Sequence, residues 1–421
     1  MITLIEAKNY RCLRYARGNL GPFHVLVGPN ASGKTTFLDV IPFLGRLLAD
    51  GPEAAVEERS RNFYDLVWKR EGENFEVAIE ARIPESRQSS LPDPKSDTIR
   101  YEVGLGLSKK SNELEIRGER VLLKHACGND TKSEQRELFP LLQEPPDTII
   151  STGGLKGIRT IVSKIDGGNA NFYSEVRQGK GRGWIPTFKL GPRRSALANL
   201  PEDESRFPAS TWLKGLLSEN VQQLVLDSRE IRKPSPPGKG RGFSPDGSNL
   251  PWVVESLNGS SPHKIREWVA HLRTALPHLK DIGTIERAED KFRYLVLKYE
   301  GGLDVPSWMA SDGTLRLLAL TLPAYLPDLD SVFLVEEPEN GIHPTAVETM
   351  YQSLSSVYDA QVLMATHSPV ILSLVEADKV LCFAKTEEGA TDIVAGSEHP
   401  ALKDWRGEEN LGVLFAGGVL G

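Results

Sequence analysis

Gly28-Pro-Asn-Ala-Ser-Gly-Lys-Thr-Thr36 is the stretch that decides the fold, because it matches the phosphate-binding pattern G-x-x-x-x-G-K-[ST] at every fixed position. The residues before it, 24–27, predict a short buried strand, and residues 35–41 predict the start of a helix. A strand, a glycine-rich loop and a helix in that order bring backbone N–H groups together on phosphate oxygens. A chance turn rich in Gly and Ser is the alternative, and the flanking segments argue against it.

The residue types in this loop suit a nucleotide triphosphate with Mg²⁺. Gly28 and Gly33 allow a tight backbone path, Lys34 reaches the β- and γ-phosphates, and the Thr35 hydroxyl is offered to the metal. The residues predicted to bind the nucleotide here are Gly28, Pro29, Asn30, Ala31, Ser32, Gly33, Lys34, Thr35 and Thr36.

Length and composition indicate a globular protein of two or three packed units. The 421 residues are 39% hydrophobic and 25% charged, and no apolar run approaches the roughly 18 residues that span a bilayer. Residues 1–8 alternate like a strand and carry no secretion signal, so we expect a cytoplasmic protein with no membrane partner. The scattered cysteines, Cys12, Cys127 and Cys382, fit reduced structural thiols.

The net charge limits how this protein could bind nucleic acid. The net charge of −7 argues against a wholly basic protein that coats nucleic acid, but not against a local basic groove. Two segments rich in Gly, Lys and Arg, residues 178–183 and 233–242, could follow a phosphate backbone, the second together with Arg229 and Arg232. Solvated flexible loops are the alternative for both segments.

Alternating apolar residues outline the rest of the chain. Residues 1–45 predict strand, turn, strand, P-loop and helix, with the turn at residues 9–15. Arg11 or Arg14 of this turn is either a nucleotide contact or a solvated arginine. Three further strand patterns predict an antiparallel sheet: residues 75–83, 98–105 and 113–123, with a loop at 84–97. Helices are predicted at residues 211–227 and 263–279, with the regular part of the second ending near Pro277, and a strand is predicted at 293–299.

Two later strands end in polar residues suited to phosphoryl transfer. Residues 331–337 form an apolar strand that ends in Glu336 and Glu337, and ligands bind at the carboxyl edge of parallel strands. We assign Glu336 to the metal and Glu337 to the attacking water; a charged cap without chemistry is the alternative. The strand at residues 360–365 leads to His367, which either contacts the γ-phosphate or is structural.

Ser311, Asp312 and Gly313 lie immediately before a helix with strong apolar content. Its N–H groups and the Ser311 hydroxyl form a second anion-binding helix start. One P-loop and two phosphate-binding helix starts are explained if this loop of one copy closes over the ATP held by another.

These motifs, in this order, resemble the ABC-type ATPase heads of the RecF/SMC and OLD-like AAA ATPases. The resemblance implies an α/β fold: an ABC-type P-loop head, a mixed sheet with an antiparallel β subdomain, and a large inserted, partly helical lobe. It divides the chain at residues 1–125, 126–285 and 286–421. It implies that residues 311–313 are the signature motif, Glu336 the Walker B acid, Glu337 the catalytic glutamate, residues 340–343 the D-loop and His367 the switch histidine.

The chain departs from the resembled families in three ways. Glu336 stands where an aspartate is usual, no Q-loop glutamine is evident before Gln88, and the residues after His367 are too few for the TOPRIM nuclease domain of OLD proteins. The resemblance therefore implies an ATPase whose effector, often a nuclease, is a separate protein, as in two-gene anti-phage systems. The apolar segment 411–421 either docks a partner or packs on the chain's own core.

Three functions compete on the sequence. The first is an ATP-hydrolysing subunit that pairs head-to-tail with a second copy and controls a separate effector in prokaryotic defence. The second is a RecF/SMC-like ATPase that binds DNA in repair or recombination. The third, the nucleotide-binding subunit of a transporter, is disfavoured because Thr36 and Ser311 are far apart in the sequence.

Overall fold

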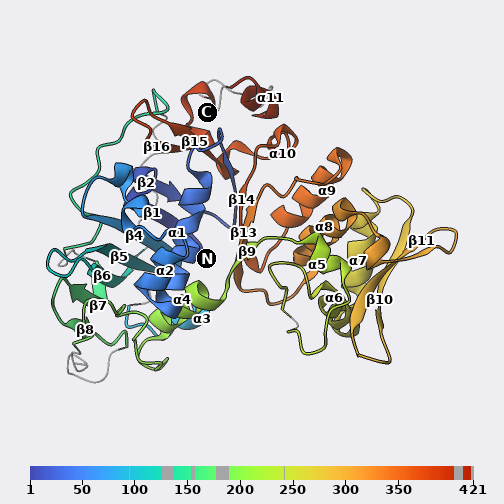
Figure 1. The fold of residues 1–421 in the computed structure, drawn as a ribbon, viewed down its shortest axis with the longest axis horizontal. Helices are drawn as coiled ribbons and strands as arrows, with labels where there is room; N and C mark the ends of the chain where they lie inside the picture. Colours follow the sequence, from blue (N-terminus) through green and yellow to red (C-terminus); the bar gives the residue numbers. More distant parts are fainter. Residues whose placement is uncertain are drawn as a thin grey trace. The chain divides into compact units, whose positions relative to one another are not determined.

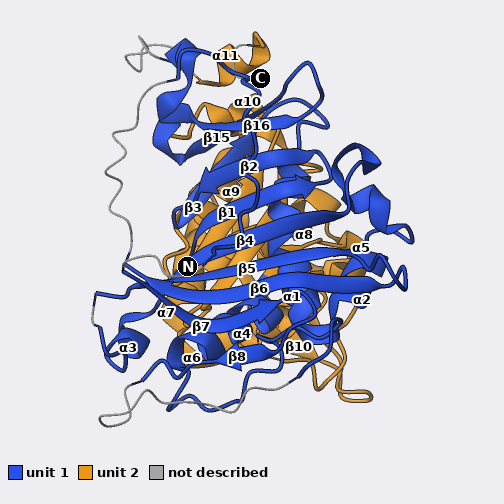
Figure 2. Ribbon diagram, turned by 90° about the vertical axis from the view of Figure 1, so that its left-hand side faces the viewer, with its two compact units in different colours: residues 1–221, 377–406, 419–421 blue, residues 222–376, 407–418 orange. Residues whose placement is uncertain are grey.

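The computed structural model describes residues 1–93, 95–125, 136–152, 157–176, 189–240, 242–402 and 411–418. The chain forms two compact units, of which the first is made of three segments and the second of two. Unit 1 is Met1–Val221, Ala377–Arg406 and Val419–Gly421, and unit 2 is Gln222–Glu376 and Gly407–Gly418 (Figure 2). The three-part division expected from the motifs stays a prediction.

An antiparallel sheet of seven strands dominates the described part of unit 1, in the order β2-β1-β4-β5-β6-β7-β8. Its inward residues are large and apolar, and Tyr10, Phe75 and Tyr101 are fully buried. The strands are β1 (Ile2–Tyr10), β2 (Leu13–Asn19), β4 (Asn74–Arg82), β5 (Thr98–Leu107), β6 (Leu114–Lys124), β7 (Ile158–Ile165) and β8 (Ala170–Phe172). The antiparallel sheet predicted from residues 75–123 is therefore present.

Three more strands of unit 1 carry and support the P-loop. β3 (Phe23–Val27) pairs in parallel with β15 (Val380–Lys385), which pairs antiparallel with β16 (Thr391–Ala395). The helices of unit 1 are α1 (Lys34–Asp50), α2 (Pro52–Glu57), α3 (Glu85–Gln88) and α4 (Pro208–Glu219). Short 3₁₀ turns complete the unit: η1 (Phe63–Leu66), η2 (Trp68–Arg70), η5 (Ala377–Lys379), η6 (Gly396–Glu398) and η7 (Pro400–Leu402).

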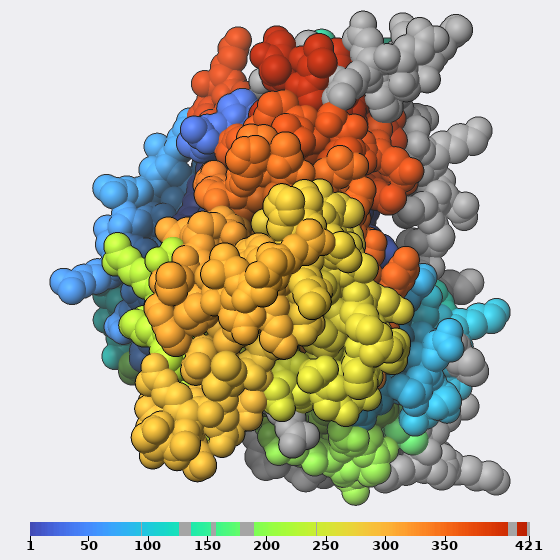
Figure 3. All heavy atoms as spheres, turned by 90° about the vertical axis from the view of Figure 1, so that its right-hand side faces the viewer, coloured from blue at the N-terminus to red at the C-terminus, as the bar shows by residue number. Residues whose placement is uncertain are grey.

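Unit 2 combines a parallel strand pair with helices and a small antiparallel sheet (Figure 1). β13 (Ser331–Glu336) pairs in parallel with β14 (Ala360–Ala365), and α9 (Pro344–Ser355) connects them. β10 (Leu279–Glu286), β11 (Arg293–Tyr299) and β12 (Asp304–Pro306) form the antiparallel sheet, and its exposed residues are part of the gold surface in Figure 3.

The remaining elements of unit 2 are helices and 3₁₀ turns. They are α5 (Ser228–Arg232), α6 (Leu250–Ser260), α7 (Pro262–Leu272), η3 (Ser307–Met309), α8 (Asp312–Thr321), η4 (Leu322–Tyr325), α10 (Pro369–Leu372) and α11 (Leu411–Ala416). α11 packs on α10, and Leu411 is buried, so this part of the apolar tail covers the chain's own core. No helix among the described residues is long and apolar enough to cross a bilayer.

Three local expectations were wrong. The helix predicted at residues 211–227 ends at Glu219, because Asn220 leaves helical geometry (φ −105°, ψ 5°), and the chain continues as β9 (Val221–Leu224). The turn predicted at residues 9–15 is confined to Arg11 and Cys12, since Tyr10 pairs with Leu13 in a hairpin that starts β2.

The third correction concerns the helix predicted at residues 263–279. The α7 helix already ends at Leu272, and the Thr274 hydroxyl donates to the His271 carbonyl at 2.7 Å in the turn that follows. Leu276 belongs to this turn, and Leu279 is the first residue of β10. The apolar spacing continued past the helix because the turn and the strand also cover the core.

Candidate functional site

The P-loop connects β3 to α1 within unit 1, as the sequence predicts (Figure 1). Lys34 is the first residue of α1, and its side chain is largely buried. Its Nζ donates to the carbonyl oxygens of Gly28 at 2.8 Å and Pro29 at 3.0 Å. The loop is therefore closed around its own lysine, and the ammonium is held at the concave side of the backbone.

Two glycines are required by both conformation and space. Gly28 has φ +152°, and a Cβ there would lie 2.1 Å from the Phe383 carbonyl oxygen. Gly33 has φ +107°, and its Cβ would lie 2.3 Å from Thr391 Oγ1. Because Thr391 Oγ1 also donates to the Ser32 carbonyl at 2.8 Å, β15 and β16 hold the loop from behind.

The loop fits the phosphate groups of a nucleotide. The N-terminus of α1 carries no side-chain cap and no acidic residue in its first turn, so its positive end is open to an anion. Ser32 Oγ is buried and has no hydrogen-bond partner among the described residues. Ala31 adopts a left-handed conformation (φ +62°), a strain typical of ligand-binding turns.

Asp39 of α1 ties this helix to the rest of unit 1. Tyr10 Oη donates to Asp39 Oδ2 at 2.6 Å, and the Arg59 guanidinium donates to both carboxylate oxygens at 2.6 to 2.9 Å. Arg11 Nη1 lies 3.8 Å from the same carboxylate, whereas Arg14 pairs with Glu388 at 3.2 Å. Both arginines considered as nucleotide contacts therefore have carboxylate partners.

Unit 2 places the predicted carboxylates and histidine at one edge. Glu336 is the last residue of β13 and is in register with Ala365, the last residue of β14. Glu337 and His367 follow these strand ends, and His367 Nε2 lies 3.8 Å from Glu337 Oε1. The sequence-predicted grouping of Glu336, Glu337 and His367 at the carboxyl edge of parallel strands is thus what the structure contains.

Glu337 is held in an uncommon backbone conformation. Its φ is +46°, its N–H donates to the Ala365 carbonyl at 2.8 Å, and Asn340 Nδ2 donates to its Oε2 at 2.5 Å. Non-glycine residues in this region cost about 1–3 kcal/mol and cluster at functional sites. The exposed Glu337 carboxylate is therefore oriented by its hydrogen bond with Asn340.

Ser311 is the N-cap of α8, as expected. Its hydroxyl accepts a hydrogen bond from the Thr314 N–H at 3.1 Å and lies 2.8 Å from Thr314 Oγ1. Gly313 lies against the loop after β13, since a Cβ there would be 2.6 Å from the Gly341 carbonyl oxygen. The predicted signature and D-loop residues therefore contact one another within unit 2.

Sequence reasoning missed two residues that hold this edge together. Glu339 Oε1 accepts hydrogen bonds from Thr366 Oγ1 at 2.6 Å and from the His367 N–H at 3.2 Å. Arg232, attributed to a basic loop, donates to the Ala310 carbonyl at 2.8 Å and pairs with Asp312 at 2.8 Å. No local pattern marks either residue, because their partners are 27 to 80 positions away in the sequence.

The basic loops give a mixed outcome. Residues 178–183 lie outside the described residues, as does Arg241. In the second segment, Lys233 pairs with Glu230 at 2.6 Å and Lys239 donates to Ser248 at 3.3 Å. Its cations are thus partly engaged by the chain itself.

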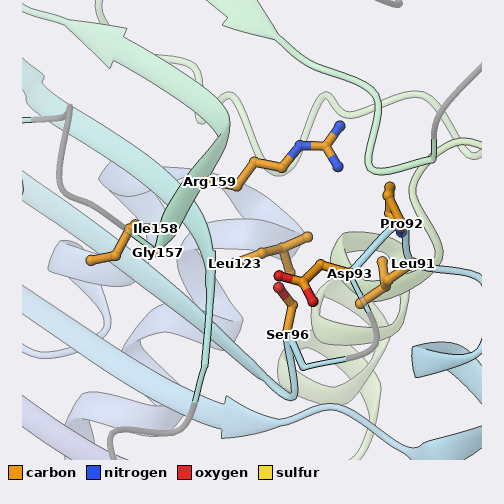
Figure 4. Close-up of a pocket in the computed structure, with 8 residues that line it drawn as sticks. All are labelled: Leu91, Pro92, Asp93, Ser96, Leu123, Gly157, Ile158 and Arg159. Carbon is orange, nitrogen blue, oxygen red and sulfur yellow. The ribbon is translucent and has the colours of Figure 1, made fainter.

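Unit 1 also contains a pocket whose lining residues do not include the P-loop. It has a volume of about 210 Å³ and is lined by Leu91, Pro92, Asp93, Ser96, Leu123, Gly157, Ile158 and Arg159 (Figure 4). The Arg159 guanidinium donates to the Ser174 and Glu175 carbonyls, and Asp93 lies 3.3 Å from His125. Its charged groups are therefore engaged within the chain.

Metal binding at the carboxylate edge would need phosphate oxygens as well. No cluster of three His, Cys, Asp or Glu side chains suited to a metal occurs in the described ranges. Mg²⁺ is a hard cation that is usually held by few protein ligands together with phosphate oxygens.

Cys12 and Cys382 are free thiols, and burial raises the pKa of Cys382 to about 12. Cys127 lies outside the described residues.

The fold and these motifs define an ABC-type P-loop ATPase head. The chain resembles an Smc head solved with the C-winged helix domain of ScpA (TM-score 0.54, 14% identity, 93% of this chain and 97% of that chain). It also resembles an Smc head with an extended coiled coil, bound to the C-terminal domain of ScpA from Pyrococcus furiosus (TM-score 0.50, 12% identity, 93% and 95%).

The family follows from the sequence match. Residues 23–142 and 167–373 match the model described as "AAA domain, putative AbiEii toxin, Type IV TA system". The chain belongs to this family. The search of curated proteins gives no relative.

Proposed function

We propose that this chain binds and hydrolyses ATP, pairs head-to-tail with a second copy, and controls a separate effector in a prokaryotic anti-phage complex of OLD-like ancestry. One observation carries the hydrolysis: the Glu337 carboxylate is held by a strained backbone (φ +46°) and by Asn340, 3.8 Å from His367. A carboxylate fixed beside an imidazole can orient a water and accept its proton.

The other roles follow from the two phosphate-binding helix starts. Residues 28–36 bind the β- and γ-phosphates through backbone N–H groups and Lys34, and Thr35 and Glu336 are the residues that would hold Mg²⁺. The metal would supply positive charge that offsets charge developing on the phosphates. His367 contacts the γ-phosphate, and Ser311, Asp312 and Gly313 of the second copy complete the enclosure.

The expected result of Glu337→Gln is retained ATP binding, turnover reduced by about 100-fold or more, and accumulation of the paired form. Phosphate release measures turnover, and sedimentation with and without ATP measures pairing. Glu348→Gln, at an exposed position of α9, is the matched control and keeps wild-type turnover. Wild-type turnover in Glu337→Gln contradicts the role of Glu337.

The defence role is supported by the family's description as part of a type IV toxin–antitoxin system. Affinity purification together with the products of neighbouring genes tests the effector. Elution of the ATPase alone, with phage plating unchanged by deletion of the gene, contradicts the proposal.

A DNA-binding ATPase of the RecF/SMC kind is the second candidate, favoured by the likeness to Smc heads. That function predicts binding to duplex DNA that is stimulated by ATP and weakened by salt. Neutralising Lys239 lowers DNA affinity if residues 233–242 form the contact.

A further inference from the structure

Arg232 contacts the residues on both sides of Ser311. Its Nη2 donates to the Ala310 carbonyl and contacts Asp312 Oδ1, each at 2.8 Å, so one guanidinium bridges the residues before and after Ser311. The Arg232 carbonyl also accepts a hydrogen bond from the buried Ser307 hydroxyl at 2.9 Å. α5 is thereby attached to η3 and to the start of α8 (Figure 1).

Asp312 creates an electrostatic problem at this helix start. Its side chain is 66% exposed and lies in the first turn of α8, beside the hydroxyl and N–H groups that would meet a phosphate. A carboxylate stabilises a helix N-terminus, but it also repels a second anion that approaches the same end. Arg232 is the cation that offsets this charge.

The Arg232 side chain is only partly exposed. Its Nε is buried and has no hydrogen-bond partner among the described residues, and its side chain is 34% exposed. A planar guanidinium that already spans Ala310 and Asp312 holds the loop between them in one conformation. The same group keeps the local charge from being negative.

We propose that Arg232 is a positioning residue of the proposed ATPase: it neutralises Asp312 and holds the Ser311 loop so that the second copy's triphosphate is accepted there. This role rests on the proposed function. It requires that Arg232 acts through Asp312, and a double substitution therefore separates it from a general contribution to folding.

The test compares Arg232→Ala, Asp312→Asn and the double variant in the full chain, with Arg229→Ala as the control on the same short helix. Arg229 is exposed and forms no ion pair with the described residues. Arg232→Ala raises the ATP concentration for half-maximal turnover by about five- to ten-fold with kcat changed less than about two-fold. The double variant recovers most of this loss, and Arg232→Lys lies between.

A second readout does not depend on turnover. Hydrogen exchange at residues 310–314 becomes faster in Arg232→Ala and stays unchanged in Arg229→Ala, because only Arg232 spans this loop. A double variant no better than Arg232→Ala, or unchanged exchange, overturns the role of Arg232 while wild-type turnover persists. Absent turnover and pairing in the wild type instead overturns the proposed function itself.

Discussion

At the scale of single residues, Glu339 shows how the histidine edge is organised. Its Oε1 receives the Thr366 hydroxyl and the His367 N–H, and Thr366 Oγ1 in turn accepts the Ser368 N–H at 2.9 Å. Thr366 is fully buried, so these bonds fix the backbone from which the histidine projects. A carboxylate acceptor makes such bonds shorter and stronger than a neutral one does.

Replacement of Glu339 therefore tests whether this backbone must be fixed. Glu339→Ala removes both acceptors and is expected to lower kcat by about ten-fold with a small change in KM, and to cost about 1–3 kcal/mol of stability. Glu339→Gln keeps a neutral acceptor and loses less of both. Steady-state kinetics and denaturant unfolding measure the two effects; a kcat equal in Glu339→Ala and the Glu348→Gln control contradicts the role.

Residue identities at the P-loop could be predicted from the sequence because the motif is local. Nine consecutive residues contain the glycines that set the loop conformation, the lysine that binds phosphate and the hydroxyl offered to the metal. Arg232 and Glu339 could not be predicted, since each acts through residues brought near only by the fold. In the sequence Arg232 stands beside other basic residues, which groups it with a segment interpreted as either a phosphate-backbone contact or a solvated loop.

At the scale of elements, the sequence predicts the strands of the antiparallel sheet well and helix ends less well. Residues 98–105 form β5 as predicted, although nearly all of its residues are buried, so both faces of the strand are covered and not one. Helix α4, by contrast, is separated from β9 by the single residue Asn220, and Leu224 continues the buried face in a strand. A pattern of apolar residues indicates which positions are buried. It does not indicate that the chain changes from helix to strand at Asn220.

α8 packs closely on the loop after β13. Gly313→Ala would put a methyl group 2.6 Å from the Gly341 carbonyl, so either the helix or the loop must move. We expect a loss of about 1–3 kcal/mol of stability and a fall in turnover of about ten-fold, because the predicted signature and D-loop residues share this contact.

Gly259→Ala provides the matched control in the same unit. Gly259 lies within α6, and nothing lies within 4 Å of the position of its added Cβ. Alanine is there expected to stabilise the helix by about 0.5–1 kcal/mol without an effect on turnover. Equal unfolding free energies for the two alanine variants would show that the Gly313 contact is not tight.

At the scale of the whole molecule, long-range pairing decides the units. β3 pairs with β15 across most of the sequence, so residues 377–406 return to the unit that holds the P-loop. The composition and the residue spacing do not predict this pairing. Strands of a parallel sheet can be far apart in the sequence, and neither strand contains a local pattern that identifies its partner. The Smc-like fold could be predicted from its motifs, whereas the path of the chain between them could not.

The stability of the whole chain should depend on pH through His24 of β3. Burial lowers the pKa of His24 below its ordinary value of 6.5, and its Nδ1 accepts a hydrogen bond from the Gly21 N–H at 2.9 Å. The unfolded chain therefore binds this proton at a higher pH than the folded chain, so the stability present above pH 6.5 is lost as pH falls through the lowered pKa. Urea midpoints between pH 7.5 and about 5 measure the loss. His24→Gln keeps a hydrogen-bond acceptor but cannot be protonated, so this variant should show a weaker dependence of stability on pH. An unchanged dependence in His24→Gln would assign the effect to other groups. One such group is His399, whose pKa is also lowered by burial.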